Sequence, residues 1–199
     1  MGAAVGGIGV VAPGLAFARV TPNATMGPFY PILKPLDQDA DLTRVSGHDG
    51  CAQGELLHLT GRVLDENGVP IVGASVEIWQ ADSNGRYTHP YDSNPAPLDA
   101  DFQGYGIQTT DAQGRYRFRT IKPAPYGMRT PHVHFQVTAK NERKVTQMFF
   151  PGEPLNERDG VLRGVSGDRG LLFARIESAG ADLEPGSKLA TFDIVLSRG

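Results

Sequence analysis

Cysteine is almost absent from this 199-residue sequence, in which Cys51 is the only one. A lone cysteine cannot close an intrachain disulfide, and it cannot supply the several thiolates of a structural zinc site. Any metal bound by this chain would therefore depend on histidine, tyrosine or carboxylate side chains.

The sequence also lacks an excess of positive charge. Its 19 Lys and Arg face 22 Asp and Glu, so the formal net charge is -3, and there is no basic run that could neutralise a row of phosphates. Outside residues 1–18 no apolar stretch approaches the length of a membrane span. Neither nucleic acid nor a membrane is therefore an expected partner.

The first 18 residues form a separate segment without a charged side chain. They are rich in Gly, Ala and Val and end in Ala16-Phe17-Ala18, which has the small-x-small form of a signal-peptidase site. A positively charged start is missing, so the segment is either a truncated export signal or a flexible arm. The first alternative predicts a periplasmic or extracellular protein and the second a cytoplasmic one. Residues 19–199 are expected to form one domain.

Turn residues are abundant, with 25 Gly and 15 Pro. Together with short alternating apolar segments, they favour many short strands over long helices. Strands are predicted over 59–64, 71–79, 115–119, 133–137, 145–150 and 192–196. The first two should pair as a hairpin around Asp65-Glu66-Asn67-Gly68, and Tyr116 and Phe118 should share the buried face of their strand. The expected fold class is all-β, a β-sandwich of short antiparallel strands with little helix.

Two segments do not fit this strand pattern. Residues 87–106 have no apolar period and several turn residues, which predicts a long loop, and such loops in compact domains are usually functional. Residues 169–178 are predicted to contain a short helix.

The motif His132-Val133-His134 is the first sign of chemistry. On a strand, residues two apart face the same side, so both imidazoles can reach one ion while Val133 faces the other way. Pro131 marks the start of that strand, and Tyr126 belongs to a rigid Pro-rich turn just before it. Taken alone, the pair is also compatible with a solvated strand face, so both interpretations stay open at this point.

With these residues in view, the sequence resembles the intradiol ring-cleavage dioxygenases, the non-haem iron(III) family that includes the protocatechuate 3,4- and catechol 1,2-dioxygenases. The resemblance covers roughly residues 21–197 in the family's order. The segments that carry it are 21–30, 73–81, 84–87, 96–99, 118–123, 131–135, 146–150 and 192–196. Single pieces are weak signals, whereas the ordered set is specific.

The resemblance implies a reaction and a site. The reaction is cleavage of a catechol-type ring between its two hydroxyls by O2, which gives a cis,cis-muconic acid. The implied ligands of a non-haem Fe(III) are Tyr87, Tyr126, His132 and His134, and the residues implied to take part in catalysis are Tyr126, as the ligand that leaves, Arg129 and Gln147. Arg129 would stabilise charge on the bound aromatic ring. Pro28, Tyr30 and Arg129 would contact substrate; the Pro28 segment comes from an adjoining subunit in some relatives, so a homo-oligomer stays open.

The charge of the ligand set supports iron independently. A tyrosine has a pKa near 10, and ionising it at neutral pH requires about 4 kcal/mol, which a strong Lewis acid can supply. With the hydroxide that the resemblance also implies as a ligand, two phenolates bring the negative charge to three, which balances Fe(III) and exceeds the charge of a divalent ion. Two neutral imidazoles complete a nitrogen and oxygen set that suits iron.

One departure from the family and two alternatives remain. Only five residues separate Tyr126 from His132, and Gly127-Met128 replaces the Pro-Trp of protocatechuate enzymes, so a more open pocket is expected. A non-catalytic β-sandwich module would explain the strands, but not the set of tyrosines and histidines. A zinc or copper enzyme built on the histidine pair would need a further His or carboxylate at suitable spacing, which the sequence lacks.

Overall fold

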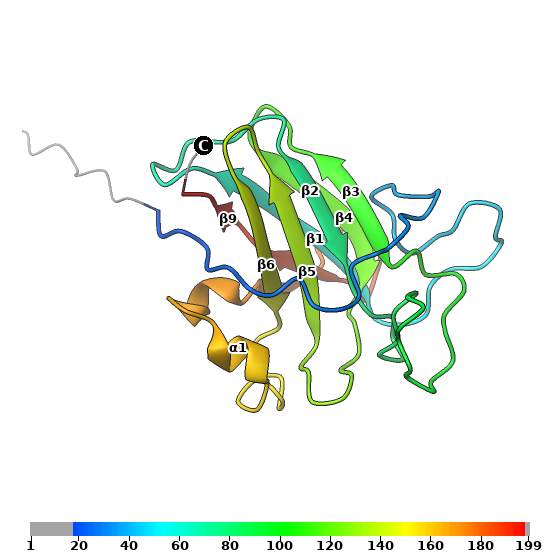
Figure 1. Ribbon diagram of the computed structural model, residues 1–199. Helices are drawn as coiled ribbons and strands as arrows, with labels where there is room; N and C mark the ends of the chain where they lie inside the picture. The colour runs from blue at the N-terminus through cyan, green and yellow to red at the C-terminus, as the bar shows by residue number, and fades with distance from the viewer. Residues whose placement is uncertain (1–17, 198–199) are drawn as a thin grey trace, which may run out of the picture.

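The computed structural model describes residues 18–197, and its strands form two sheets packed as a sandwich (Figure 1). The first sheet has the order β4-β1-β8-β7 with β9 beside β1, and the second has the order β3-β2-β5-β6. The first sheet contains β1 (Leu56–Leu64), β4 (Arg115–Ile121), β7 (Arg175–Ser178), β8 (Lys188–Thr191) and β9 (Ile194–Val195). The second contains β2 (Ser75–Trp79), β3 (Tyr105–Thr109), β5 (His132–Thr138) and β6 (Arg143–Phe149).

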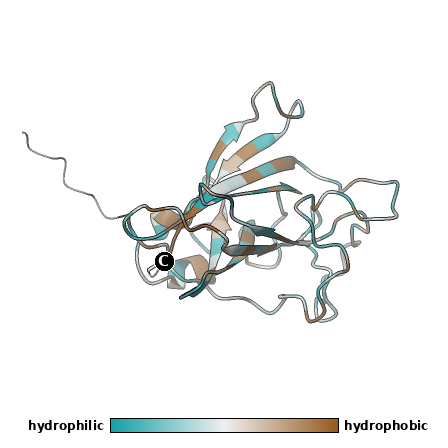
Figure 2. Cartoon of the chain, turned by 90° about the horizontal axis from the view of Figure 1, so that it is seen from above, coloured by the Kyte–Doolittle hydropathy of each residue, from teal (hydrophilic) through white to brown (hydrophobic). Residues whose placement is uncertain are grey.

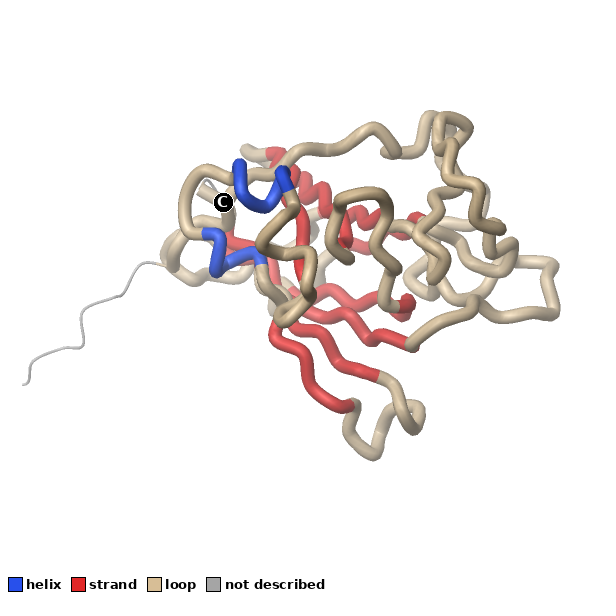
Figure 3. The backbone as a smooth tube through the Cα atoms, turned by 90° about the horizontal axis from the view of Figure 1, so that it is seen from below, coloured by secondary structure: helices blue, strands red, loops and turns tan. Residues whose placement is uncertain are grey.

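Helix is scarce, and loops make up much of the remaining chain (Figure 3). Within residues 18–197 there is one α-helix, α1 (Gly160–Gly164), and one 3-10 helix, η1 (Arg169–Leu172). The predicted all-β sandwich is thus confirmed, with one difference in strand direction, since β1 pairs in parallel with both β8 and β9. No helix among these residues has the length and apolar character needed to cross a bilayer. The predicted signal or arm covers residues 1–18. All of it except Ala18 lies outside the described residues.

The core lies between the two sheets because strand residues alternate in direction (Figure 2). Leu59 and Phe118 of the first sheet and Ile78 and Phe135 of the second are each fully buried there. As predicted, Tyr116 and Phe118 share the buried face of β4. The same alternation turns the residues between the core positions of β2 and β5 to the outer face of the second sheet.

The hairpin predicted from 59–64 and 71–79 is wrong, because β1 and β2 lie in different sheets. The turn itself forms: the Gly68 N–H donates to the Asp65 carbonyl at 2.9 Å and the Ile71 N–H to the Val63 carbonyl at 2.9 Å. Pro70 has no N–H with which to extend this pairing. The chain then bends at Gly73, whose φ is 76°, and crosses to the second sheet.

Other element boundaries also differ from prediction. Residues 169–178 are helical only over Arg169–Leu172, and β7 then pairs with β8. The predicted loop 87–106 stops at Gly104, because Tyr105 starts β3 and pairs with Trp79. The strand predicted over 192–196 is limited to Ile194–Val195, where it pairs with the end of β1.

An N-terminal arm, residues 20–36, crosses the outer face of the second sheet as the blue trace in front of β6 and β5 (Figure 1). The Ala24 N–H donates to the Val145 carbonyl at 3.0 Å, and the Thr146 hydroxyl donates to the Pro22 carbonyl at 2.8 Å. Farther along, Gly27 lies against the His134 ring and the Tyr30 hydroxyl donates to Glu77 at 2.7 Å, so the arm covers the sheet face that carries His132 and His134.

Candidate metal centre

The two histidines lie at the start of β5, on the outer face of the second sheet. His132 and His134 are 2% and 1% exposed, while Val133 between them is buried in the core. The indole of Trp79, opposite His134 in the β2–β5 register, stacks on the His134 ring with 4.9 Å between centroids and 10° between planes. Pairing between strands thus fixes the direction in which the imidazoles point.

The free nitrogens of the two imidazoles face one another. Nδ1 of His132 lies 2.6 Å from the Thr130 carbonyl oxygen, which can only accept, so Nδ1 carries the proton and Nε2 presents its lone pair. That Nε2 is 3.2 Å from Nε2 of His134. Burial, helped by the charge of Arg129, lowers the pKa of His132 to about 4, and burial and His132 lower the pKa of His134 well below its usual value. Both rings are neutral at pH 7, as a metal ligand must be.

The two predicted tyrosines complete the cluster. The rings of Tyr87 and Tyr126 meet edge to face with 5.3 Å between centroids. The Tyr126 ring is 5.7 Å from the His132 ring, and the Tyr87 ring is 6.2 Å from the His134 ring. The structure thus brings together side chains from a long loop, a turn and a strand.

Local backbone contacts explain why the two tyrosine-bearing loops meet. The fully buried carboxylate of Asp82 accepts the N–H groups of Asn84 at 2.8 Å and Arg86 at 2.9 Å, which folds the loop just before Tyr87. Gly85 has a φ of 75° and lies against the turn of Tyr126, where a β-carbon would come within 2.5 Å of the Pro125 carbonyl oxygen. Only glycine permits this close approach.

Polar atoms in the cluster are buried without partners. Among residues 18–197, neither Tyr87 Oη nor His134 Nδ1 makes a hydrogen bond of normal geometry. Burial and the neighbouring Tyr126 raise the pKa of Tyr87 well above its usual value. Burial also raises the pKa of Tyr126, although the charge of Arg129 opposes it. An unpartnered buried polar group is unfavourable by about 1–3 kcal/mol, so the cluster fits a cation that would bind the Tyr87 hydroxyl oxygen together with the two facing Nε2 atoms.

The donor set narrows the kind of cation. In the described part of the chain, no three His, Cys, Asp or Glu side chains are grouped to hold a metal. The cluster instead offers two imidazole nitrogens and two phenol oxygens. Phenol oxygens are useful ligands only when ionised, which favours a metal ion of high charge.

Arg129 and Gln147 lie beside the tyrosines and bond to each other. The Arg129 Nη2 donates to Gln147 Oε1 at 2.6 Å, and the Gln147 amide donates to the Thr25 carbonyl of the N-terminal arm at 2.7 Å. The Arg129 Nε donates to the buried Asp159 at 2.8 Å. Asp159 was not predicted from the sequence, where only its place before a short apolar segment could have marked it as a helix cap.

The N-terminal arm contributes a ring that the sequence analysis also passed over. Phe29 packs against Tyr87 with 4.8 Å between centroids and against Tyr126 with 5.8 Å. Its neighbours, both expected to contact substrate, lie farther out. Pro28 is exposed, and Tyr30 packs on Trp79 and donates its hydroxyl to Glu77 at 2.7 Å. The matching segment 21–30 pointed to this stretch without distinguishing the residue that faces the tyrosines.

Comparisons with known proteins identify the family. A family model described as Dioxygenase matches residues 25–198. The chain is 43% identical over 175 residues to the protocatechuate 3,4-dioxygenase beta chain of Burkholderia cepacia, an alignment that covers 82% of this chain and 73% of that protein. It is 32% identical over 170 residues to the hydroxyquinol 1,2-dioxygenase of Rhizobium sp., covering 73% of this chain and 56% of that protein.

A solved structure agrees with the sequence relatives. The dioxygenase domain of a dioxygenase carbohydrate-binding protein fusion from Streptomyces sp. SirexAA-E has a TM-score of 0.70 and 30% identity, over 91% of this chain and 100% of that one. The chain belongs to the intradiol ring-cleavage dioxygenase family, whose members typically carry non-haem Fe(III). The family and the enzyme class expected from the sequence are confirmed, and the non-catalytic module is not supported.

Proposed function

We propose that this chain cleaves a catechol-type ring between its two hydroxyls, with incorporation of O2, to give a cis,cis-muconic acid. The metal in this proposal is a non-haem Fe(III). Its proposed ligands are the side chains of the buried cluster: Tyr87, Tyr126, His132 and His134. The observation that carries the proposal is the pair of facing Nε2 atoms beside a buried, unpartnered Tyr87 hydroxyl.

Bound Fe(III) would supply Lewis acidity, which holds the tyrosines as phenolates at neutral pH and draws the oxygens of a diol into the site. The protein's own groups divide the remaining work. Tyr87 is 4% exposed and enclosed by other rings, which suits a ligand that stays in place. Tyr126 is half-buried, next to Arg129, and is therefore the better acceptor, at its Oη, for a proton that the entering diol must lose.

Arg129 is a fixed positive charge beside the phenols. Its Nε and Nη2 are held by Asp159 and Gln147, so the guanidinium can stabilise negative charge on the diol oxygens without reorganising. Phe29 covers the tyrosines from the arm side and excludes water there. We assign Gln147 the task of orienting Arg129.

The choice among catechols is expected to be broad. The turn between Tyr126 and Arg129 is short and Met128 within it is 63% exposed, so the turn itself places no aromatic ring over this side of the site. Relatives of this chain are named for protocatechuate, hydroxyquinol and catechol. We propose that ring substituents project past Met128 and that more than one of these diols is cleaved.

The visible spectrum tests the ligand set. Iron-loaded protein should be red-brown from phenolate-to-Fe(III) charge transfer, and Tyr87→Phe and Tyr126→Phe should each shift that band. Tyr105→Phe is the matched control, since Tyr105 is as buried as Tyr87 and its hydroxyl is already engaged by Glu77 at 2.7 Å. A colourless protein with a full equivalent of Fe(III) would contradict the proposed ligands.

Oxygen uptake tests the reaction. Catechol, protocatechuate and hydroxyquinol are offered in turn, and one O2 should be consumed for each ring cleaved. A colourless muconate product supports cleavage between the hydroxyls. A yellow semialdehyde would mean cleavage beside them, which the proposal does not allow.

A further inference from the structure

Asp159 is a completely buried carboxylate whose two oxygens bind different parts of the molecule. Its Oδ1 accepts the N–H groups of Val161 at 2.9 Å and Leu162 at 3.0 Å, and so caps α1. Its Oδ2 accepts the Arg129 Nε at 2.8 Å and the Thr130 N–H at 2.9 Å. One oxygen is therefore a helix cap, and the other belongs to the segment that leads into the histidine pair.

Capping alone does not account for a buried charge at this position. A neutral Ser, Thr or Asn caps a helix about as well as Asp, and a carboxylate removed from water is unfavourable unless it is paired. Asp168 shows a capping carboxylate elsewhere in the chain: its Oδ1 accepts the Gly170 N–H at 2.8 Å, its Oδ2 pairs with Arg19, and its side chain is 41% exposed. The burial of Asp159 and its contact with Arg129 indicate a further role.

The first consequence of the Oδ2 contacts concerns Arg129. With Nε bound to Asp159 and Nη2 bound to Gln147 Oε1 at 2.6 Å, the planar guanidinium is held on two sides. Its side chain is 15% exposed, so water competes little for these donors. The hydrogen bond from Nε to Asp159 therefore helps to fix the orientation of the Arg129 guanidinium beside Tyr126.

The second consequence concerns His132 and passes through Thr130. The Thr130 N–H is held by Asp159 Oδ2, and the Thr130 carbonyl oxygen is 2.6 Å from His132 Nδ1. The Thr130 hydroxyl is also bonded, at 2.7 Å, to Asn156 in the segment just before Asp159. Because the N–H, the carbonyl and the hydroxyl of Thr130 are all engaged, a shift at Asp159 would rotate the imidazole that the carbonyl orients.

We propose that Asp159 is a positioning residue that sets the orientation of the Arg129 guanidinium and, through Thr130, that of the His132 imidazole. This inference rests on the proposed function of the cluster. It assigns Asp159 no contact with substrate. It predicts that the effect of the carboxylate on the site depends on Arg129 and His132, the two groups that it positions.

The test uses Asp159→Asn and Asp159→Ser in the iron-loaded protein. The serine variant retains a capping oxygen but has no second oxygen for Arg129, so it remains informative if the asparagine variant folds poorly. We expect kcat per bound iron to fall about 100-fold, the effect of misplacing a catalytic group by about 1 Å. The charge-transfer band of the resting protein should hardly move, because both phenolates remain. Asp168→Asn, the matched capping control, should leave kcat unchanged.

A double-mutant cycle separates positioning from capping. In an Arg129→Ala background, the loss of kcat from Asp159→Ser should shrink to a few-fold, because the group that it positions has gone. An equal loss in both backgrounds, or full kcat per bound iron in the single variants, would overturn the role toward Arg129.

Iron affinity, measured by chelator competition, tests the role toward His132 without relying on turnover. Loss of a partner that orients a ligand typically weakens metal binding 10–100-fold, so Asp159→Ser should lose iron to the chelator at least about 10-fold more readily, and Asp168→Asn should not. Equal affinities would overturn this part of the inference. If the wild-type protein binds iron but consumes no oxygen, the proposed reaction is wrong, and the affinity comparison still decides the role of Asp159 toward His132.

Discussion

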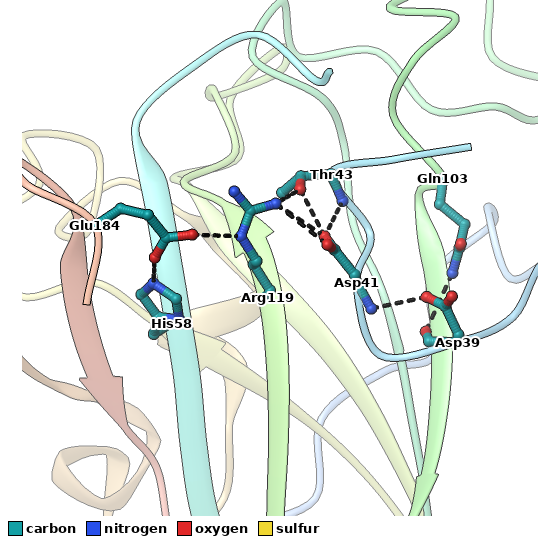
Figure 4. Close-up of polar contacts among 7 residues, drawn as sticks. All are labelled: Asp39, Asp41, Thr43, His58, Gln103, Arg119 and Glu184. Atoms are coloured by element: carbon teal, nitrogen blue, oxygen red, sulfur yellow. Dashed lines mark hydrogen bonds and ion pairs between the residues drawn. The ribbon is translucent and has the colours of Figure 1, made fainter. Parts of the chain in front are cut away.

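Both sheets carry histidine on their outer faces, but the partners of the histidine nitrogens differ between the two faces. On the first sheet, His58 Nε2 bonds to Glu184 at 2.6 Å, and the same carboxylate accepts Arg119 Nε at 2.9 Å (Figure 4). On the second sheet, His132 bonds to a backbone carbonyl, and His134 Nδ1 has no partner within residues 18–197. On the outer face of the first sheet (the first face) a carboxylate occupies the histidine nitrogen, whereas on the outer face of the second sheet (the second face) two neutral imidazoles keep lone pairs that a cation could bind.

The two faces also differ in exposure. The network continues from Arg119 to Asp41 at 3.1 Å, and these two side chains are 27% and 37% exposed, so water and salt screen their charges (Figure 4). The His–Tyr cluster is closed by the N-terminal arm. Substitutions should therefore have large and specific effects on the second face, and small, salt-sensitive ones on the first.

Replacing one histidine on each face by alanine should give the largest difference, in iron affinity and in oxygen uptake. His134→Ala removes a proposed ligand, and we expect iron affinity to fall by more than about 100-fold, because even partners that only orient ligands are worth 10–100-fold. Oxygen uptake should fall with it. His58→Ala should keep both iron and activity. Metal analysis and oxygen-electrode rates measure the pair, and equal iron contents in the two variants would remove the distinction between the faces.

Replacing Glu77, a carboxylate on the second face, should have the next largest effect, on the free energy of unfolding and not on iron affinity. Glu77 is 6% exposed and accepts the Tyr30 and Tyr105 hydroxyls at 2.7 Å each and Lys34 Nζ at 2.8 Å. Glu77→Gln leaves the lysine without its partner. We expect a loss of about 2 kcal/mol in the free energy of unfolding, less than the 3–5 kcal/mol of a fully buried pair because Lys34 is 38% exposed.

The pH dependence of this loss has a definite sign. Burial alone would raise the pKa of Glu77, but Lys34, Tyr30 and Tyr105 outweigh it and hold that pKa below its usual value. A lowered folded-state pKa contributes stability above the unfolded value of about 4.3, and the contribution is lost as pH falls through the folded value. Urea unfolding should therefore show the wild type and Glu77→Gln converging in acid. A gap that stays constant down to pH 2 would contradict the assignment.

The sequence predicts those features of the two faces that follow from neighbouring residues, and not those that depend on contacts between distant segments. Alternation over 115–119 and 133–137 predicts which side of each strand is buried, and the spacing of His132 and His134 places them on one face, because both follow from the two-residue period of a strand. The partner of β2 depends on packing across the sandwich, so the hairpin prediction is wrong. Asp159 reaches Arg129 across 30 residues, a contact that no local pattern specifies.

Two glycines, one beside the histidines and one in an open turn, should differ in the same direction. Gly27 and Gly73 have φ values of 72° and 76°, so alanine should introduce similar backbone strain at either, about 1 kcal/mol. A β-carbon at Gly27 would lie 3.0 Å from His134 Cε1, whereas nothing lies within 4 Å of one at Gly73. Because Trp79 stacks on the His134 ring, that ring has little freedom to shift.

Gly27→Ala should therefore lose more stability than Gly73→Ala, by about a further 1 kcal/mol, and should alone shift the charge-transfer band of the iron-loaded protein. Thermal unfolding and the visible spectrum measure the two effects. Identical spectra and midpoints for the two variants would mean that the arm does not press on the histidine.

The smallest effect is expected at Glu184, on the exposed first face. Its own backbone N–H, and then Arg119 and His58, lower the pKa of Glu184 to about 2. Any stability that the carboxylate adds is thus present above its unfolded pKa of about 4.3 and is lost as pH falls toward 2.

Glu184→Gln should lower the free energy of unfolding least in this series at pH 7. About 1 M salt should remove most of that difference, since the Debye length is then about 3 Å. The Glu77→Gln difference should persist in the same salt, because its carboxylate is buried. A salt-insensitive loss at Glu184 that equals the loss at Glu77 would show that the two faces do not differ in the way their exposure indicates.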